Sequence, residues 1–183
     1  GLPVEVPEFQ GTDEEISQKG FEYTQNHFFD NTDLSDVRLL RTPILEQKID
    51  YYLDRLTLQA PKYIIEGCKK IIALSEKQGK NYQFVVSHLL NKYAKSKVVG
   101  FDEIYVFLAE TYYTPEKAPW IDTEQLNKIR ENAASIKPIL IGKKAPNISL
   151  TQQDGFATNL HAIEANYSIL YFHNTNCENC AST

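Results

Sequence analysis

The sequence predicts a mainly α-helical fold, an antiparallel bundle of about six helices followed by a short β-hairpin and one further strand. Three observations lead to this prediction. Apolar residues recur at three-and-four spacing between residues 12 and 137, and helix start signals precede most of these runs. After Pro138 apolar residues recur at every second position. Asp154-Gly155, a strong turn pair, then separates two short alternating runs.

The first two predicted helices begin at recognisable caps. Thr12 and Glu15 match a capping box, in which the hydroxyl accepts the Glu15 amide and the carboxylate reaches back. This helix is predicted to end near Phe29. After a polar, irregular stretch, Thr42 is expected to cap a second helix, with Pro43 at its first position, where the missing amide costs nothing.

Single residues mark the next three helices. Pro61 is predicted to open the third helix, and Gly79 to end it in the left-handed conformation. Asn81 is expected to cap the fourth helix, and Asp102 the fifth, after a break at Gly100. The residues predicted to face the core on the second to fifth helices are Leu45, Ile49, Tyr52, Leu53, Leu56, Ile64, Cys68, Ile71, Ile72, Tyr82, Val85, Leu89, Tyr93, Ile104, Tyr105, Leu108 and Tyr112.

The last helix has the most explicit start. Asp122 and Gln125 match a capping box, and Ile121 and Leu126 match a hydrophobic staple. We expect this helix to end before Pro138, because proline cannot continue it.

The residues after the last helix predict β-structure. The alternating runs 147–150 and 156–160 are expected to pair as a hairpin, and 160–164 to form one helical turn. The apolar run 167–172 is predicted to be a buried central strand. The boundary between the helical and β regions is expected between residues 137 and 144.

Composition excludes several classes of protein. The 183 residues carry a net charge of −5, with basic and acidic residues interspersed, so we expect no nucleic-acid partner. No apolar run is long enough to span a membrane. Residues 1–11 predict an extended, proline-stiffened arm. Because the chain holds no methionine, we expect it to be processed or trimmed, with any N-terminal signal already removed.

The three cysteines fall into two groups. Cys68 lies on an apolar helical stripe and is interpreted as a small buried residue. Cys177 and Cys180 form a C-x-x-C that directly follows the predicted strand 167–172 and a short polar loop. This arrangement is typical of a redox dithiol at a strand-to-helix turn.

Five landmarks over the last 43 residues carry a family resemblance. They are Ile141-Gly142-Lys143-Lys144-Ala145-Pro146-Asn147-Ile148-Ser149-Leu150, Asp154-Gly155, Asn159-Leu160, Leu170-Tyr171-Phe172 and Cys177-x-x-Cys180. In this order they resemble the opening of thioredoxin-like domains, most closely the envelope thiol-disulfide oxidoreductases related to TlpA and ResA. The resemblance covers residues 141–183, well under half of such a domain. It implies that residues 138–183 are the incomplete start of a thioredoxin-like α/β domain.

The helical region carries a second resemblance. Its landmarks are Phe28-Phe29-Asp30-Asn31, Asp33, Ser35-Asp36, Leu39-Leu40-Arg41-Thr42-Pro43, Gly100-Phe101-Asp102, Thr111-Tyr112-Tyr113 and Trp120. They resemble an uncharacterised helical domain that precedes the thioredoxin module in many secreted or lipid-anchored bacterial proteins. The resemblance implies that residues 12–137 form this domain. It also implies a location in the periplasm or cell envelope. One alternative within this location is a lipid anchor, attached where an N-terminal signal has been removed.

The thioredoxin-like resemblance implies roles for both terminal cysteines. Cys177 would be the attacking thiolate and Cys180 the resolving thiol, acting on the thiol or disulfide of a protein client or redox partner. No cofactor and no metal is implied. Glu178 departs from the family pattern, and its charge should oppose formation of the thiolate.

Other interpretations of the cysteines were weighed. The spacing before Cys177 and Cys180 does not match a peroxiredoxin site. A zinc site would have His173 with the two cysteines but lacks a fourth ligand. A surface disulfide or two idle thiols stays an alternative. The rival function is a non-catalytic binding or scaffold module, in which the helical bundle recognises a client, a peptide or a glycan-related ligand.

The helical region offers weaker candidates. Asp30, Asp33 and Asp36 superficially match a calcium loop, but the glycine and distal glutamate are absent, which favours turns and caps. Trp120 is expected to anchor the last helix. An aromatic set is interpreted as core, with a ligand groove as the alternative: Phe21, Tyr23, Phe28, Phe29, Tyr51, Tyr52, Tyr105, Phe107, Tyr112 and Tyr113.

Residues 1–183 by themselves are expected to have little or no disulfide reductase activity. They lack the helix that would follow Cys180 and lower the pKa of Cys177, and the pKa of that thiol should stay near the ordinary value of ~8.5. Turnover of insulin disulfides at neutral pH measures this activity, and robust turnover would contradict the expectation. The predicted strand 167–172 would also present unpaired edges, so we expect it to pack on its own bundle or to pair in a homodimer.

Overall fold

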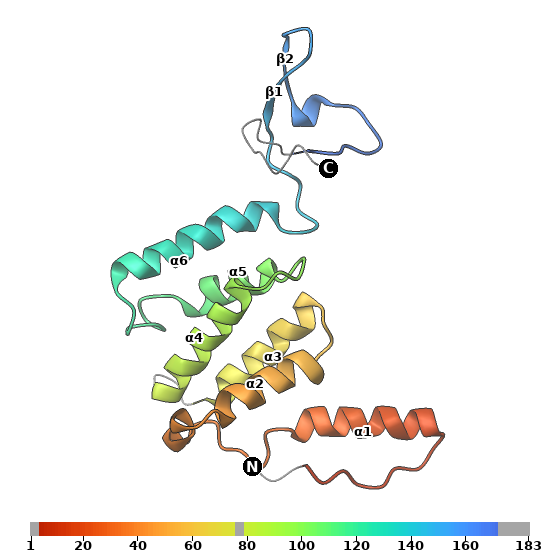
Figure 1. Cartoon of the computed structure of the whole chain (residues 1–183), viewed down its shortest axis with the longest axis vertical. Helices are drawn as coiled ribbons and strands as arrows, with labels where there is room; N and C mark the ends of the chain where they lie inside the picture. Colours follow the sequence, from red (N-terminus) through yellow and green to blue (C-terminus); the bar gives the residue numbers. More distant parts are fainter. Residues whose placement is uncertain (1–3, 76–78, 172–183) are drawn as a thin grey trace, which may run out of the picture. The chain divides into compact units, whose positions relative to one another are not determined.

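A computed structural model gives the structure of the protein and describes residues 4–75 and 79–171. The chain divides into two compact units, Gly1–Lys144 and Ala145–Thr183. In the described part, the first unit holds six α-helices and the second holds a two-stranded antiparallel sheet (Figure 1). The predicted mainly α fold class is therefore confirmed. None of the described helices is long and apolar enough to cross a membrane.

The elements follow one another in a simple order. The first unit contains α1 (Asp13–His27), the 3₁₀ turn η1 (Val37–Arg41), α2 (Ile44–Arg55), α3 (Pro61–Leu74), α4 (Lys80–Ala94), α5 (Asp102–Tyr112), α6 (Thr123–Ile136) and the 3₁₀ turn η2 (Lys137–Ile139). The second unit contains β1 (Ser149–Thr151), β2 (Ala157–Asn159) and the 3₁₀ turn η3 (Leu160–Ala162).

The core of the first unit surrounds α3, which contacts α2, α4 and α5 (Figure 1). One face of α3 places Ile64, Cys68 and Ile71 fully inside. Gly67 lies on the same helix, and a β-carbon there would come within 2.9 Å of Leu53 Cδ2. The absence of a side chain at this position therefore allows α2 and α3 to pack closely. Helix α6 adds a further layer by packing on α5.

Helix α1 begins as the sequence predicts. The Thr12 hydroxyl accepts the Glu15 amide at 3.3 Å, and the Glu15 carboxylate accepts the Thr12 amide at 2.9 Å, so both halves of the capping box are present. The helix ends at His27, two residues before the predicted end at Phe29, because Phe29 is part of the buried core.

Polar contacts attach α1 to the rest of the unit. No residue of α1 is buried. The Gln25 side chain donates to the Leu56 carbonyl at 2.5 Å. The Lys70 ammonium donates to the carbonyl oxygens of Gln25 and Asn26, at 3.2 and 3.1 Å. Because these carbonyls lie in the last turn of α1, the lysine also complements the negative end of the helix dipole.

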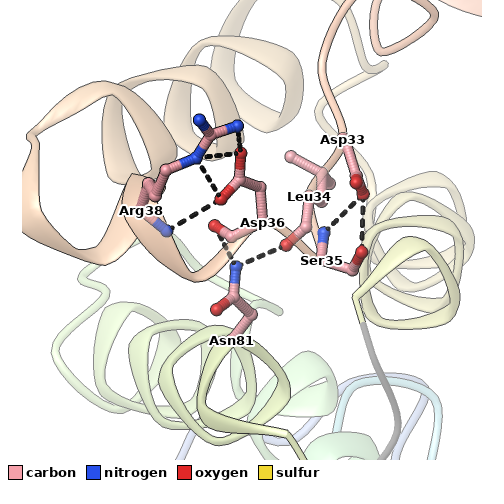
Figure 2. Close-up of polar contacts among 6 residues, drawn as sticks. All are labelled: Asp33, Leu34, Ser35, Asp36, Arg38 and Asn81. Carbon is pink, nitrogen blue, oxygen red and sulfur yellow. Dashed lines mark hydrogen bonds and ion pairs between the residues drawn. The ribbon is translucent and has the colours of Figure 1, made fainter.

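Two predicted roles around α4 are wrong. Gly79 has an extended backbone with φ of −77°, and it is the N-cap of α4 rather than a left-handed end of α3. Asn81 lies inside α4 and is 1% exposed, so it does not cap the helix. Its side-chain amide instead donates to the carbonyl oxygens of Leu34 and Asp36, at 2.7 and 3.0 Å (Figure 2). Asn81 therefore holds the loop before η1 against α4.

The starts of α5 and α6 also differ in detail from the prediction. Gly100 has a φ of 88°, and Phe101 is the N-cap of α5, so Asp102 is its first residue and not its cap. At α6 the Asp122 carboxylate accepts the Gln125 amide at 2.8 Å, as predicted. The Trp120 ring, expected over the last helix, packs edge-on against Tyr82 of α4, with 5.6 Å between ring centroids.

Strands β1 and β2 form the predicted hairpin. Ser149 pairs with Asn159, and Thr151 pairs with Ala157. Gly155 turns the chain with a φ of 86°, a conformation that favours glycine, and the Asp154 carboxylate accepts the Phe156 amide at 3.1 Å. The turn chemistry read from the sequence is thus the chemistry that closes the hairpin.

The predicted strand 167–172 is not present over 167–171, and Phe172 lies outside the described residues. The only sheet in the described part is β1–β2. A strand forms through its ladder of hydrogen bonds, so β-propensity alone does not produce one. Nothing in the described residues therefore bears on the predicted homodimer.

Replacing Asn81 with alanine is expected to lower the free energy of unfolding by about 1–3 kcal/mol, because two buried carbonyls lose their donor. Asn91→Ala is the matched control, since Asn91 is exposed on the same helix. Urea unfolding of both variants measures the difference. Equal stabilities would show that the Asn81 contacts contribute nothing net.

Candidate functional site

The predicted dithiol lies beyond the part of the chain that the structure describes. Cys177 and Cys180 fall within residues 172–183, as does Glu178. Their assignment as redox residues stays a prediction. The described residues of the second unit show what leads up to them.

A histidine fixes the base of the hairpin that precedes the dithiol. The His161 amide donates to the Asn147 side chain at 3.0 Å. The ring Nε2 of His161 lies 2.8 Å from the Ala145 carbonyl oxygen. A carbonyl only accepts, so Nε2 carries the proton and donates. The residues before β1 and after β2 are thereby held together, and this sets where the next segment begins.

The segment after η3 exposes large apolar side chains. Tyr167 is 91% exposed and Ile169 is 95% exposed, and Tyr171 is also largely exposed. A group of exposed apolar side chains of this kind usually packs against another part of a protein. The segment leading to Cys177 therefore has the composition of a buried element, although its large side chains are exposed.

A charged network joins α2 to α4. Glu46, Asp50 and Asp54 lie one helical turn apart on α2, facing His88 and Lys92 of α4. Asp50 Oδ1 lies 2.9 Å from His88 Nε2 and 3.1 Å from Lys92 Nζ, and Lys92 Nζ lies 2.8 Å from Asp54 Oδ2. Burial lowers the pKa of Lys92, but its hydrogen bonds to Asp54 and Asp50 outweigh this, so the pKa is raised.

This network was not predicted from the sequence. Its signal was the four-residue spacing of the carboxylates at 46, 50 and 54, together with the same spacing at 88 and 92. Neither set of regularly spaced residues indicates by itself that the two helices face each other. The pairing comes from the packing of α2, α3 and α4, which only the fold supplies.

Three members of the network have ligand atoms close enough for one metal ion. Atoms of Glu46, Asp50 and His88 lie within 4.8 Å of one another. The Lys92 ammonium already contacts the Asp50 oxygen, and His88 directs its two ring nitrogens toward different carboxylates. A cation placed there would compete with Lys92 for Asp50. The contacts fit an ion-pair network between helices better than a metal centre.

The acidic residues that superficially match a calcium loop instead stabilise turns (Figure 2). The Asp33 carboxylate accepts both the amide and the hydroxyl of Ser35, and these bonds hold the pKa of Asp33 below its ordinary value. Asp36 caps η1 by accepting the amide and guanidinium of Arg38, which lowers its pKa in the same way. The turn interpretation is confirmed.

Comparison with known proteins identifies the family. The family model described as "Domain of unknown function (DUF5106)" matches residues 2–138. The chain belongs to the DUF5106 family. No curated protein matches it significantly.

One solved structure shows the fold that this DUF5106 chain shares. It is the crystal structure of a thioredoxin-like protein from Bacteroides caccae ATCC 43185, with a TM-score of 0.66 and 21% sequence identity. The match covers 98% of this chain and 63% of that chain, so the chain spans under two thirds of the solved protein. At this identity the match shows a common fold. It supports the coarser part of the first resemblance, that of a thioredoxin-like protein.

The aromatic set of the DUF5106 domain divides into core and surface. Phe29, Tyr52 and Tyr113 are buried, as the core interpretation predicts. Phe21 and Tyr51 are exposed, and Tyr51 stacks on Phe28 with 5.7 Å between ring centroids. The core interpretation therefore holds for only part of the set.

Cys68 is fully buried in the DUF5106 domain, as predicted, and burial raises the pKa of its thiol to about 12. Burial likewise raises the pKa of Tyr113 to about 12. A thiol that is buried and protonated at neutral pH is a poor nucleophile. Cys68 is therefore a structural residue and serves as an internal control for the other two cysteines.

The stability of the protein is expected to fall as the pH rises from about 9 to 12. In the unfolded chain Cys68 and Tyr113 lose their protons near their ordinary pKa values of 9.0 and 10.0, whereas in the folded chain they keep them until about pH 12. Between about pH 9 and 12, loss of these protons therefore stabilises the unfolded state relative to the folded state. Urea unfolding at intervals of pH measures the loss.

The contribution of the Cys68 thiol can be isolated. Cys68→Ala lowers stability at neutral pH because it leaves a small cavity. Its stability should nevertheless fall less steeply above pH 9, by up to about 1.4 kcal/mol per pH unit, because one titrating proton is gone. Identical slopes in the two proteins would contradict the assigned burial of the thiol.

Proposed function

We propose that this protein is a thiol-disulfide oxidoreductase of the bacterial envelope, related to the TlpA and ResA type, with a DUF5106 helical domain before its thioredoxin-like module. The observation that carries the proposal is the order of elements in the second unit. A hairpin, a 3₁₀ turn and an apolar segment lead directly to Cys177-x-x-Cys180. The thioredoxin-like solved structure matches 98% of the chain, so both units are included in the match.

The chemistry of such a site is an exchange of disulfides. The Cys177 thiolate attacks one sulfur of a client disulfide, forming a mixed disulfide and releasing the first client thiolate. The Cys180 thiolate then attacks the Cys177 sulfur and releases the second client thiolate. The dithiol is oxidised to a Cys177–Cys180 disulfide, the client is reduced by two electrons, and no metal or cofactor takes part.

A non-catalytic binding module is the second candidate function. A cavity of about 560 Å³ in the helical unit favours it, since this volume is in the range of ligand sites. The two candidates are compatible, because the cavity and the dithiol lie in different units. A binding site in the helical unit would leave the exchange chemistry of Cys177 unchanged.

The redox proposal predicts a defined outcome with the disulfide reagent DTNB at neutral pH. The reduced wild-type protein should end as an intramolecular disulfide without adduct, because Cys180 resolves the first product. Cys180→Ser should stop at a stable mixed disulfide on Cys177. Intact-mass spectrometry separates these products.

Cys68→Ser is the matched control, and it should give the wild-type product because the Cys68 thiol is buried. Cys177→Ser should react several-fold more slowly than Cys180→Ser if Cys177 is the attacking thiol. Equal rates for these two variants, or a stable adduct on the wild type, would refute the assigned roles.

A further inference from the structure

A cavity of about 560 Å³ lies where the connection between α4 and α5 meets the end of α6. Its walls come from the last turn of α4, residues 96–100, the first turn of α5, the last turn of α6 and Ile141. All of these residues belong to the helical unit. The charged network between α2 and α4 does not contribute to it.

One side of the cavity is apolar and faces water. Val98 is 56% exposed, Val99 is 84% exposed and Ile141 is 71% exposed, and all three line the cavity. Ile141 packs on Gly100 so closely that a β-carbon there would lie 3.2 Å from its Cδ1. Three large aliphatic side chains left in water around one hollow are typical of a surface that another molecule covers.

The other side of the cavity presents a carboxylate that lacks a donor. Asp102 Oδ1 is buried, and it has no hydrogen-bond partner among the residues that the structure describes. Asp102 is the first residue of α5, it lines the cavity, and the residue as a whole is only partly buried. A cationic group of a molecule bound in the cavity can therefore pair with this carboxylate and gain binding energy.

Lys97 also lines the cavity, and it forms none of the ion pairs found in the described part of the chain. The lysine therefore does not neutralise Asp102. The whole chain carries a net charge of −5, which attracts basic partners. Asp102 is therefore the charged group beside the apolar wall that a basic partner would complement.

The form of the cavity favours a polypeptide over a small molecule. Small-molecule sites usually enclose most of their ligand. Here the aliphatic wall is itself largely exposed, so a ligand would keep one face in water. An extended peptide does this naturally, since alternate side chains point to opposite sides.

We propose that this cavity binds an extended polypeptide segment in which a basic side chain lies two residues from an apolar one, so that both point to the same side. The apolar side chain packs on Val98, Val99 and Ile141, and the ammonium or guanidinium group donates to Asp102. The proposal does not depend on the cysteines, so failure of the redox assignment would leave it intact, and the reverse also holds.

Fluorescence anisotropy of the whole chain with a fluorescein-labelled peptide, Gly-Ala-Leu-Ala-Lys-Ala-Gly, in which the leucine and lysine share one face when extended, tests the proposal. Dithiothreitol is present so that disulfide exchange cannot contribute. Asp102→Asn should weaken binding about tenfold, because a charge-assisted hydrogen bond is lost. Lys97→Gln should strengthen binding severalfold, because a like charge is removed. For a peptide with glutamate in place of lysine, the two variants should change affinity in the opposite directions.

Asp13→Asn is the matched control, since Asp13 is likewise the first residue of a helix and lies outside the cavity. It should leave the affinity unchanged, and circular dichroism should show that all variants keep their helices. Absence of binding at millimolar peptide would overturn the proposal, as would equal affinities for wild type and Asp102→Asn. Equally tight binding of N-acetyl-lysine amide would also overturn it, because the site would then take a small cation and not a polypeptide.

Discussion

The packing of α3 is the constraint on which the rest of the helical unit depends. This helix has neighbours on three sides, α2, α4 and α5, and its inward residues are fully buried. A helix in that position needs side chains that fill space on each side and a small residue where a neighbour comes closest. The space-filling side chains are those of Ile64, Cys68 and Ile71, and the small residue at the closest approach is Gly67. A larger residue at position 67 would push Leu53 out of the centre of the core.

The position of α3 also explains where the polar interactions lie. With α2 and α4 both packed on α3, their remaining faces meet at an edge that is only partly covered. Asp50, His88 and Lys92 lie at this edge, and their side chains are between 16% and 33% exposed. Ion pairs at this depth are less screened than surface pairs and do not carry the full desolvation penalty of a deep interior. The network therefore helps to align the two helices, while the apolar core supplies most of the stability.

The features that sequence predicted correctly are those that local chemistry decides. The capping box of Thr12 and Glu15 and the turn at Gly155 depend on residues within a few positions of each other. The roles that were wrong depend on distant parts of the chain. Asn81 resembled a cap, but it donates to a loop more than forty residues away. The segment 167–171 has strand composition but does not form a strand in the described structure. The cavity at Asp102 was not predicted, because three separate stretches of the chain form it.

The attachment of α1 has a consequence for the dynamics of the molecule. A helix with no buried residue that is held by Gln25 and Lys70 can separate from the core without exposing the apolar interior. We therefore expect its opening free energy to be a small fraction of the global value, and its amides to exchange with solvent as a separate cooperative segment. In such a molecule a slow-exchanging centre built on α3 would coexist with an N-terminal helix that opens and closes independently.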